Sequence, residues 1–579
     1  MCGIAGIITK SNKRAALEKM LYTQQHRGPD YTGFYAEESS IYLGHNRLSI
    51  IDLSPEANQP FADKKGRYQL VFNGEIYNYI ELRERLKKRY DFTTQSDTEV
   101  LLAAFIIYGE SCLEHLNGMF AFAIWDSHKK TLFAARDRFG VKPFYYFMYG
   151  EDFYFASEIK SIRAVTGALL PNKKVWANYF LHGSYGLPNE TFYDGLNQLP
   201  PGHFLTLKND QIKVKIWYDF VKNVLEAERT TDFKIAQEQY LDLLKDAINL
   251  RFRADVSIGF NISGGLDSSL LLALVNNMHE GSQIKVYTFY TGDERYDELP
   301  WVEQMLQTVE NPLQKVRLKS SEVKDYARRL AAAQDEPFGG IPTIAYAKIF
   351  EQARKDGVIV LLDGQGMDEQ WAGYDYYAEK AKENSTIQGI SSQSTPFKSA
   401  CISEKLARYA EKPVYPQPFD NRLQNLQYRD LFYTKLTRAL RFNDRISMAS
   451  STELREPFLD YRLIEFAFAQ QAAFKIKGDV HKYFLRELVK DVLPQKLTYA
   501  PKRPLQTPQR EWFAEDLKPY VDQQVEALKS SPFADWFVHE EIEFELQKYK
   551  SGERQSSFHI WQWINFSLLS TSFKSQGLD

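Results

Sequence analysis

The chain has 579 residues, of which 44% are hydrophobic and 25% charged, and its net charge is -3. This length exceeds what one hydrophobic core supports, so two or three domains are expected. The composition is that of an ordinary globular protein, and the small net charge gives no electrostatic reason to expect nucleic acid or an anionic membrane as a partner. No apolar run reaches the roughly 18 residues that span a bilayer. The three cysteines are too scattered for a disulfide framework, which favours the cytoplasm.

The first third of the sequence predicts short strands separated by turns. We expect a strand over residues 68–72 that ends in a turn at 73–75, and strands over 120–125 and 131–135. Helices are predicted over 80–90 and from Asp97, a residue type suited to an N-cap, to about Tyr108. A cluster of Pro and Gly around residues 199–203 indicates a domain boundary near residue 205, followed by a connecting segment over 206–231.

Residues 232–579 change to an alternation of helices and buried strands. An amphipathic helix over 233–250 precedes predicted strands over 256–262, 285–290 and 358–362, with a helix over 268–278. This alternation indicates an α/β domain with a doubly wound parallel sheet. From about Gln424 the pattern is mostly helical, and the polar stretch 383–399 is expected to be a mobile surface loop.

Cys2 is a candidate nucleophile because of its place in the chain. Removal of Met1, which a small following residue permits, would leave Cys2 with both a thiol and a free α-amine. An α-amine has a pKa of about 7.7–8.0, so the residue would carry its own base for forming the thiolate. Taken alone, Cys2 is equally well explained as an ordinary small N-terminal residue.

A second pattern is Ser-Gly-Gly-Leu-Asp-Ser-Ser at residues 263–269, between a predicted strand and a helix. Glycines let the backbone approach a ligand closely, and the N–H groups at a helix start bind phosphate oxygens. The serines add hydrogen-bond donors, and Asp267 can hold a divalent cation. No lysine follows the glycines, so the loop differs from the Walker type. The alternative is a strand–helix turn that serines cap.

Together the two patterns resemble one family. The loop at 263–269 is the signature of ATP pyrophosphatases, which cleave ATP between the α and β phosphates. With Cys2-Gly3-Ile4, the chain as a whole resembles the glutamine-hydrolysing asparagine synthetases. Further motifs carry this resemblance along nearly the whole chain: His26–Asp30, Arg47–Ile50, Asn73–Asn78, Ser96–Glu99, Arg136–Gly140, Ser157–Lys160, Asp363–Glu369 and Glu456–Asp460.

The resemblance implies an α+β N-terminal-nucleophile glutaminase domain with a four-layer αββα fold over residues 1–205. The Cys2 thiolate would attack the side-chain amide of glutamine and release ammonia from a thioester. Asn73 and Gly74 would hold the oxyanion. Arg47 would bind the α-carboxylate and Asp97 the α-ammonium of glutamine, although an ordinary ion pair is the alternative for both. The glutamine site would be completed by Glu75, Leu48, Ser49, Ile50 and Ile51.

For residues 232–579 the resemblance implies an ATP-pyrophosphatase domain with a helical C-terminal part. ATP would activate a carboxylate as an acyl-adenylate, which ammonia then attacks. Asp267 and Asp368 would hold Mg²⁺. Lys482 would neutralise charge on the α-phosphate, although a solvated helix residue is the alternative. The ATP and pyrophosphate site would consist of Ile262, Ser263, Gly264, Gly265, Leu266, Asp267, Ser268, Ser269, Thr291, Asp363 and Gly364.

Two departures from the family pattern concern the acceptor. The family loop Ser-Gly-Glu-Gly-x-Asp-Glu carries a Glu thought to help deprotonate ammonia, and Gln365 stands in its place. An amide cannot accept a proton at neutral pH. The stretch Asp335–Thr343 is shorter than in aspartate-using members and lacks their arginine, and Glu336 is a candidate for part of the lost acid/base role.

We therefore expect a cytoplasmic enzyme that amidates aspartate to asparagine, with glutamine, ATP and Mg²⁺ as its small-molecule partners and a homodimer as its assembly. Ammonia would need a sealed passage between the domains, because in water at pH 7 most of it is protonated. An amidotransferase acting on another carboxylate, such as a sugar acid, a peptide or an antibiotic precursor, stays open. A non-catalytic relative is a third possibility, against which the intact Cys2 and the 263–269 loop argue.

Overall fold

The computed structural model describes residues 2–279, 281–378, 396–503, 506–553 and 556–574. Within these ranges no helix is both long and apolar enough to cross a bilayer. Most of the polar stretch 383–399, which the sequence predicts as a mobile loop, lies outside the described residues.

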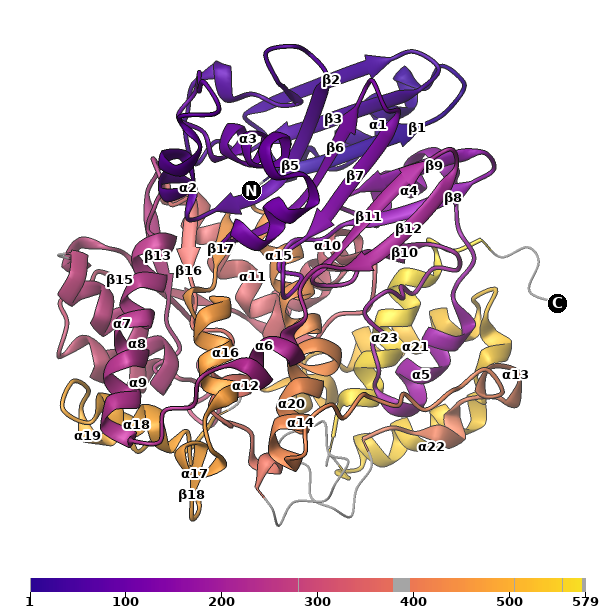
Figure 1. Ribbon diagram of the computed structural model, residues 1–579. Helices are drawn as coiled ribbons and strands as arrows, with labels where there is room; N and C mark the ends of the chain where they lie inside the picture. Colours follow the sequence, from indigo (N-terminus) through magenta and orange to yellow (C-terminus); the bar gives the residue numbers. More distant parts are fainter. Residues whose placement is uncertain (1, 280, 379–395, 504–505, 554–555, 575–579) are drawn as a thin grey trace.

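The N-terminal domain contains two antiparallel sheets and four helices that cover them (Figure 1). Its strands are β1 (Gly3–Ile8), β2 (Tyr31–Glu37), β3 (Ile41–Arg47), β4 (Phe61–Ala62), β5 (Tyr68–Ile76), β6 (Gly118–Asp126), β7 (Thr131–Arg136), β8 (Tyr145–Tyr149), β9 (Asp152–Ala156), β10 (Asn197–Gln198), β11 (His203–Lys208) and β12 (Gln211–Ile216). Its helices are α1 (Arg14–Thr23), α2 (Tyr79–Leu86), α3 (Asp97–Tyr108) and α4 (Ile159–Thr166).

The two sheets stack face to face and bury a shared apolar layer. Their strand orders are β10-β8-β9-β1-β3-β2 and β12-β11-β7-β6-β5-β4. Ile4, Val71 and Leu205 belong to the cluster between them. Helices α1 and α4 pack on the first sheet, and α2 and α3 pack on the second. The layers are thus helix, sheet, sheet and helix, which confirms the predicted αββα fold.

Two local expectations in this domain are wrong. The predicted turn at 73–75 is a continuation of β5, because Asn73 and Gly74 pair with Ala121 and Phe120 of β6. The N-cap of α3 is Ser96, whose hydroxyl accepts the Thr98 N–H at 3.1 Å, while Asp97 occupies the first turn.

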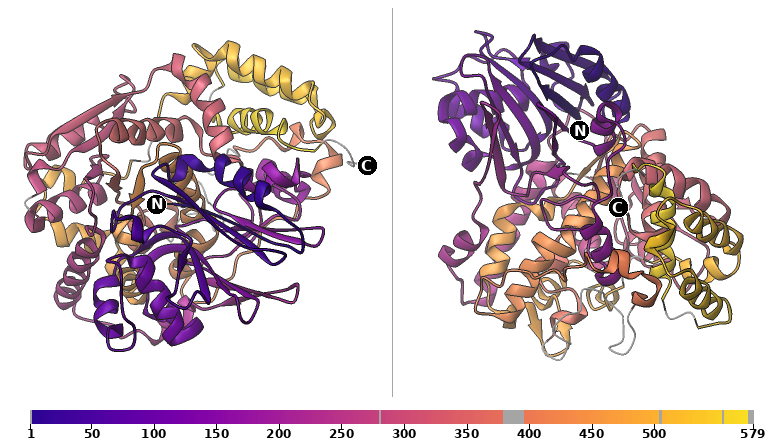
Figure 2. Two further views of the ribbon diagram at one scale, coloured as in Figure 1. Left: turned by 90° about the horizontal axis from the view of Figure 1, so that it is seen from above. Right: turned by 90° about the vertical axis from the view of Figure 1, so that its right-hand side faces the viewer.

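The predicted domain boundary at residue 205 falls inside a hairpin. Strand β11 pairs with both β7 and β12, so the second sheet continues to Ile216. In contrast, helix α5 (Lys173–His182) leaves the sheets and packs among the C-terminal helices (Figures 1 and 2). Trp176 lies 4.8 Å from Phe566, between ring centroids. A segment of the first half therefore packs into the second domain, and one apolar cluster contains residues of both.

The second domain is built on a parallel sheet of five strands in the order β15-β14-β13-β16-β17. They are β13 (Ile258–Asn261), β14 (Val286–Tyr290), β15 (Leu313–Arg317), β16 (Val360–Leu362) and β17 (Glu453–Arg455). All four pairings are parallel, which confirms the doubly wound sheet. The chain order reverses direction between β13 and β16, and ligands of such sheets bind beyond the carboxyl ends of the strands at that point.

Helices surround this sheet and form the C-terminal part of the chain (Figure 2). They are α6 (Phe220–Glu226), α7 (Phe233–Arg251), α8 (Leu266–His279), α9 (Leu299–Leu306), α10 (Val323–Gln334), α11 (Gly340–Lys355), α12 (Met367–Gln370), α13 (Glu404–Ala407), α14 (Arg422–Arg429), α15 (Leu436–Met448), α16 (Tyr461–Ala469), α17 (Ala472–Lys475), α18 (Tyr483–Val489), α19 (Gln495–Thr498), α20 (Gln509–Ala514), α21 (Lys518–Lys529), α22 (His539–Lys550) and α23 (Phe558–Ser570). A short hairpin of β18 (Ile476–Lys477) and β19 (Val480–His481) precedes α18.

Candidate active sites

Cys2 is held in place by three neighbours at the start of β1. Its backbone N–H donates to Asn73 Oδ1 at 3.1 Å, and its carbonyl accepts from Arg27 Nε at 3.0 Å. The thiol Sγ lies 3.9 Å from the Leu48 carbonyl oxygen, to which it donates. Burial raises the pKa of the Cys2 thiol. Thiolate formation at this position would therefore need a nearby base.

Asn73 holds Cys2 through its side-chain oxygen alone. The Nδ2 group of Asn73 is buried and makes no hydrogen bond among the described residues. A buried amide donor beside a candidate nucleophile is the feature that an oxyanion hole needs. The neighbouring Gly74 leaves no room for a side chain, since a Cβ there would lie 2.1 Å from the Met119 carbonyl oxygen.

The charged residues predicted to bind glutamine lie close to Cys2. Arg47 donates to the carbonyl oxygens of Ser54, at 2.8 Å, and of Asp52. Asp97 accepts the Ile76 N–H at 2.9 Å, and burial raises the pKa of Asp97 to about 6. Neither residue has an ion-pair partner among the described residues, which removes the ordinary ion-pair alternative. Arg47 and Asp97 therefore carry charges that no described counter-ion neutralises, although Arg47 already donates to neutral oxygen acceptors.

Glu75 and residues 48–51 frame the same pocket. Glu75 lies 3.5 Å from Arg455, which reaches it from β17 of the other domain, and burial raises the pKa of Glu75 well above its usual range. Leu48, Ile50 and Ile51 are buried directly after β3. The Ser49 N–H is bound by Asp30 Oδ2 at 2.8 Å. The sequence-predicted glutamine site is therefore one cluster in space.

The loop after β13 opens into a cavity of about 1000 Å³. Gly264 has φ +67°, and a Cβ there would lie 2.7 Å from the Val302 N, so this position requires glycine. Gly265 faces the cavity, where a Cβ would meet only Ser263 Oγ, at 3.3 Å. The serines at 263 and 268 contact each other at 3.2 Å between their hydroxyls. A glycine-rich backbone segment flanked by hydroxyl groups can bind phosphate oxygens.

Most residues predicted for the ATP site line this cavity. They are Ile262, Ser263, Gly265, Leu266, Asp267, Ser268, Asp363, Gly364, Asp368 and Lys482. Gly264, Ser269 and Thr291 are not among the lining residues. Thr291 instead donates its N–H and its hydroxyl to Asp297 Oδ1, at 2.7 and 2.8 Å. Thr288 and Phe289 of β14 line the cavity in its place.

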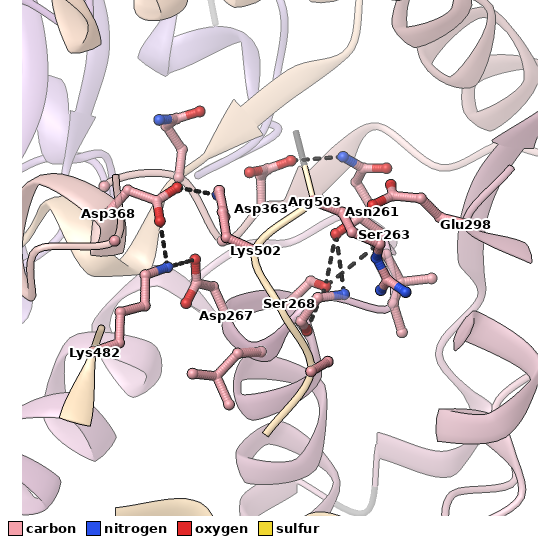
Figure 3. Close-up of a pocket in the computed structure, with 18 of the residues that line it drawn as sticks. Asn261, Ser263, Asp267, Ser268, Glu298, Asp363, Asp368, Lys482, Lys502 and Arg503 are labelled. Carbon is pink, nitrogen blue, oxygen red and sulfur yellow. Dashed lines mark hydrogen bonds and ion pairs between the residues drawn. The ribbon is translucent and has the colours of Figure 1, made fainter. Parts of the chain in front are cut away.

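Lys482 joins the two carboxylates predicted to hold a metal (Figure 3). Its Nζ lies 2.5 Å from Asp267 Oδ2 and 2.6 Å from Asp368 Oδ1. The alternative of a solvated helix residue is wrong, since Lys482 is buried, with φ +54°, at the N-cap of α18. Such backbone strain in a non-glycine residue concentrates at functional sites. Gly373 allows this approach, because a Cβ there would lie 1.9 Å from Asp368 Oδ1.

The same carboxylates fit a magnesium ion. Asp267 Oδ1 is buried and has no hydrogen-bond partner among the described residues. Carboxylate oxygens are the ligands that Mg²⁺ prefers, and the ion usually completes its shell with water and substrate phosphates. No group of three or more potential metal-ligating side chains occurs in the described part of the chain. Asp267 and Asp368 would therefore hold Mg²⁺ together with phosphate oxygens.

Sequence reasoning missed three residues of this cavity. Lys502 binds the second oxygen of Asp368, and Arg503 stacks on Trp301 with its Cζ 3.8 Å from the ring centroid. Burial raises the pKa of Glu298, beside them, to about 7. The adjacent basic pair at 502–503 is a signal in the sequence, but nothing there indicates that it crosses the 263–269 loop (Figure 3).

Glu336 does not occupy the acid/base position suggested for it. It is buried, with Oε2 3.1 Å from Arg441 Nη1 and with Oε1 accepting the Phe192 N–H at 3.0 Å. It is also absent from the cavity lining, to which the same stretch contributes Pro342 and Thr343. Glu336 ties the two domains together, because Phe192 belongs to the N-terminal half.

Arg27 connects the two sites and was noted in the sequence only as part of a motif. It is fully buried and makes a bidentate contact with Asp444, at 2.9 and 3.1 Å, besides binding the Cys2 carbonyl. Asn443, the residue before Asp444 on α15, lines the ATP cavity. One arginine side chain thus lies between the Cys2 pocket and the wall of the cavity.

Comparison with known families agrees with this geometry. The family model described as glutamine amidotransferase domain matches residues 1–218, which places the N-terminal half in the class of glutamine amidotransferases. The model described as asparagine synthase matches residues 239–571. The chain therefore belongs to the asparagine synthase family.

Individual relatives are moderately similar. Asparagine synthetase [glutamine-hydrolyzing] 1 of Bacillus subtilis is 28% identical, over 98% of this chain and 96% of its own length. Asparagine synthetase [glutamine-hydrolyzing] 3 of the same organism is 30% identical, over 87% of this chain and 86% of its own. Amidase chyE of Penicillium rubens is 28% identical, over 93% of this chain and 94% of its own. Proteins similar to this chain thus carry both synthetase and amidase names.

Proposed function

We propose that this protein uses glutamine as nitrogen donor and ATP as activator to amidate a carboxylate, and that aspartate is the acceptor. The observation that carries the proposal is the contact of Lys482 with both Asp267 and Asp368 at the edge of the 263–269 loop. A lysine held by two carboxylates beside a phosphate-binding backbone is placed to neutralise charge on a phosphate group, which is more than a structural ion pair would do.

In the glutaminase half, the Cys2 thiolate would attack the glutamine amide carbon. Asn73 Nδ2, the unpartnered donor, would bind the oxyanion of the tetrahedral intermediate. Arg47 and Asp97 would fix the α-carboxylate and the α-ammonium of glutamine, so that the amide lies over the sulfur. The Cys2 α-amine, having taken the thiol proton, would pass it to the leaving nitrogen, so that collapse releases ammonia and leaves a thioester on Cys2. Water would then hydrolyse the thioester to free glutamate.

In the synthetase half, backbone N–H groups and hydroxyls of residues 263–269 would hold the pyrophosphate oxygens. Mg²⁺, held by Asp267 and Asp368, would supply charge neutralisation on the phosphates when bound. Lys482 would move from the two carboxylates to pair with the α-phosphate, where negative charge develops. Lys502 would pair with the released pyrophosphate. The acceptor carboxylate would thereby become an acyl-adenylate that ammonia can attack.

A different carboxylate acceptor is the second candidate, and one observation favours it. The cavity wall that helices α11 and α15 contribute contains no basic side chain: it consists of Pro342, Thr343, Tyr346, Ala439, Phe442 and Asn443. Free aspartate carries a second carboxylate, which a cation would best bind. The relative named an amidase is in line with acceptor variation inside the family.

An acceptor screen tests the proposal. We expect purified protein with glutamine, Mg-ATP and aspartate to form asparagine, AMP and pyrophosphate in equal amounts. Pyrophosphate release that depends on another carboxylate, with aspartate inert, would establish the second candidate. A protein that forms neither glutamate nor pyrophosphate with any acceptor would be a non-catalytic relative. Light scattering on the same sample would test the proposed homodimer.

A further inference from the structure

Tyr346 and Asp363 form a hydrogen-bonded pair in the wall of the ATP cavity. Tyr346 Oη donates to Asp363 Oδ2 at 2.5 Å, and the same oxygen accepts from Asn261 Nδ2 at 2.6 Å. All three residues line the cavity. Asp363 follows β16 and Asn261 ends β13, so these two residues stand where the strand order reverses (Figure 3).

Helix α11 presents Tyr346 together with other cavity-lining side chains. Pro342, Thr343 and Tyr346 are spaced by three or four residues, so they share one face of α11. Helix α15 packs against α11 and contributes to the same wall, and its Asn443 precedes the Asp444 bound by Arg27. Ammonia that leaves the Cys2 pocket along this interface would enter the cavity on the side that Tyr346 faces.

The proposed reaction needs a proton acceptor at this point. When ammonia attacks an acyl-adenylate, its nitrogen gains positive charge and must lose a proton before the amide can form. Gln365, in the loop after β16, lines the cavity but carries an amide, which cannot accept that proton. Chemistry therefore requires a different base in this chain.

Other carboxylates that line the cavity are less suited to this role, and two of them, Asp375 and Asp479, are exposed to solvent. Asp267 and Asp368 bind Lys482 and are the candidate magnesium ligands. Glu298 follows β14, whereas Gln365 follows β16, and β13 lies between these two strands in the sheet. Glu336 is occupied by Arg441 and Phe192 outside the cavity.

We propose that Tyr346 and Asp363 act as a proton relay that replaces the missing glutamate at position 365. This inference rests on the proposed amidation. The ammonia nitrogen forms a bond to the acyl carbon as the carbonyl electron pair moves to oxygen. One N–H proton passes to Tyr346 Oη while the phenolic proton passes to Asp363. The carbonyl then re-forms, the bond from the acyl carbon to the phosphate oxygen breaks, and AMP leaves with that electron pair.

The protonation state of Asp363 is compatible with the relay. Burial raises the pKa of Asp363, although the hydrogen bonds from Tyr346 and Asn261 oppose this effect. A carboxylate with a raised pKa is a stronger base than a solvated one. After AMP has left, Asp363 returns its proton to solvent through the open cavity.

The test compares three partial reactions of Tyr346→Phe with those of the wild type: glutaminase activity, acceptor-dependent exchange of pyrophosphate into ATP, and amide formation with ammonium as donor. The acceptor is the carboxylate that the screen identifies. We expect glutaminase activity and exchange to stay within about twofold, while amide formation falls by about 10²–10⁴-fold. The amount of pyrophosphate released should then exceed the amount of amide formed, because water hydrolyses the acyl-adenylate that has not reacted with ammonia.

Two further variants keep the test decisive. Gln365→Glu combined with Tyr346→Phe should recover at least about tenfold of the lost rate, because a carboxylate base is restored. Tyr287→Phe is the matched control, since Tyr287 is a buried tyrosine that donates to Asp356 at 3.1 Å away from the cavity.

Some results would overturn the relay. These are amide formation unchanged in Tyr346→Phe, loss of exchange in parallel with amide formation, or no recovery in the double variant. A wild-type protein that exchanges pyrophosphate with no carboxylate at all would instead overturn the proposed function itself.

Discussion

The thiol of Cys2 and its surroundings show how individual residues prepare the first site. Three hydrogen bonds hold Cys2, through Asn73, Arg27 and Leu48. Asn73 keeps its second amide group free. The site is therefore organised before any ligand is present, which lowers the entropic cost of reaching a reactive geometry.

For the nucleophile, we expect Cys2→Ala to lower glutamine-dependent amidation by more than about 10⁴-fold, since the attacking atom is lost. Ammonium-dependent amidation should remain, because the second site is untouched. Product formation with each nitrogen source measures this. Cys112→Ala, which removes another buried thiol of the same domain, is the control. Loss of both activities in a folded Cys2→Ala protein would contradict the two-site arrangement.

Asp97 should make glutamine binding depend on pH. Burial raises the pKa of Asp97 to about 6 in the empty pocket, so the carboxylate is protonated below that pH and cannot pair with the ligand ammonium. Because the folded-state pKa is raised, the ionised form costs stability as pH rises through this range, and ligand binding offsets that cost.

Calorimetry on Cys2→Ala, which binds glutamine without hydrolysing it, measures this dependence. We expect affinity to fall by about tenfold per pH unit below pH 6, as one proton competes with the ligand. Asp97→Asn should bind weakly at every pH. An affinity that stays constant between pH 5 and pH 7 would show that Asp97 does not hold the ammonium.

At the scale of elements, residues in loops and at helix starts place the functional side chains. Lys482 reaches its carboxylates because α18 begins with a left-handed residue. Gly373 leaves the space into which the Lys482 side chain and Asp368 fit. The Ser96 cap starts α3 so that Asp97 points back toward the end of β5.

Gly373→Ala should disturb the phosphate site alone. Its Cβ would lie 1.9 Å from Asp368 Oδ1 and 2.3 Å from Lys482 Cε, so both groups must move. A displacement near 1 Å typically costs about 10²-fold in rate, and we expect that loss in pyrophosphate exchange. Glutaminase activity should not change. Gly478→Ala, a nearby glycine with open space around it, is the control, and equal losses in both variants would contradict this account.

At the scale of the whole molecule, buried ion pairs join the two domains. Arg27 binds Asp444, and Arg455 lies beside Glu75. Arg455 also accepts the Asp363 N–H through its carbonyl at 3.0 Å, so one residue touches both the loop after β16 and the glutamine pocket. The interface therefore includes residues that contact both sites.

Replacing Arg27 should weaken both stability and coupling. Arg27→Met leaves Asp444 without its bidentate partner and removes one of several cations from Glu158, which costs about 3–5 kcal/mol. Denaturant unfolding of the full chain measures this loss. The ratio of glutamate to amide formed should also rise, because ammonia escapes at the interface. Arg328→Met, which breaks an exposed pair with Asp325, should cost no more than about 1 kcal/mol. Similar costs in the two variants would contradict a structural role for Arg27.

Several features of this fold could be read from the sequence because they are local. The loop at 263–269 and the strands around it follow from glycine, serine and apolar runs whose geometry neighbouring residues decide. The prediction that the strand ends at residue 72 is wrong, because distant residues decide where this strand ends. Asn73 and Gly74 favour turns by themselves, but β6 supplies partners 46–48 positions away that keep them extended.

From the sequence alone, local patterns predicted the doubly wound sheet, and the resemblance of motifs along the chain implied the αββα domain, the family and the two kinds of site. Each depends on residues a few positions apart or on a motif held along the chain. Tertiary structure alone decided that Arg27 joins Cys2 to Asp444, that Glu336 ties domains together, and that Tyr346 meets Asp363. Such contacts join residues from separate elements, and only the packing of those elements brings their side chains within hydrogen-bonding distance.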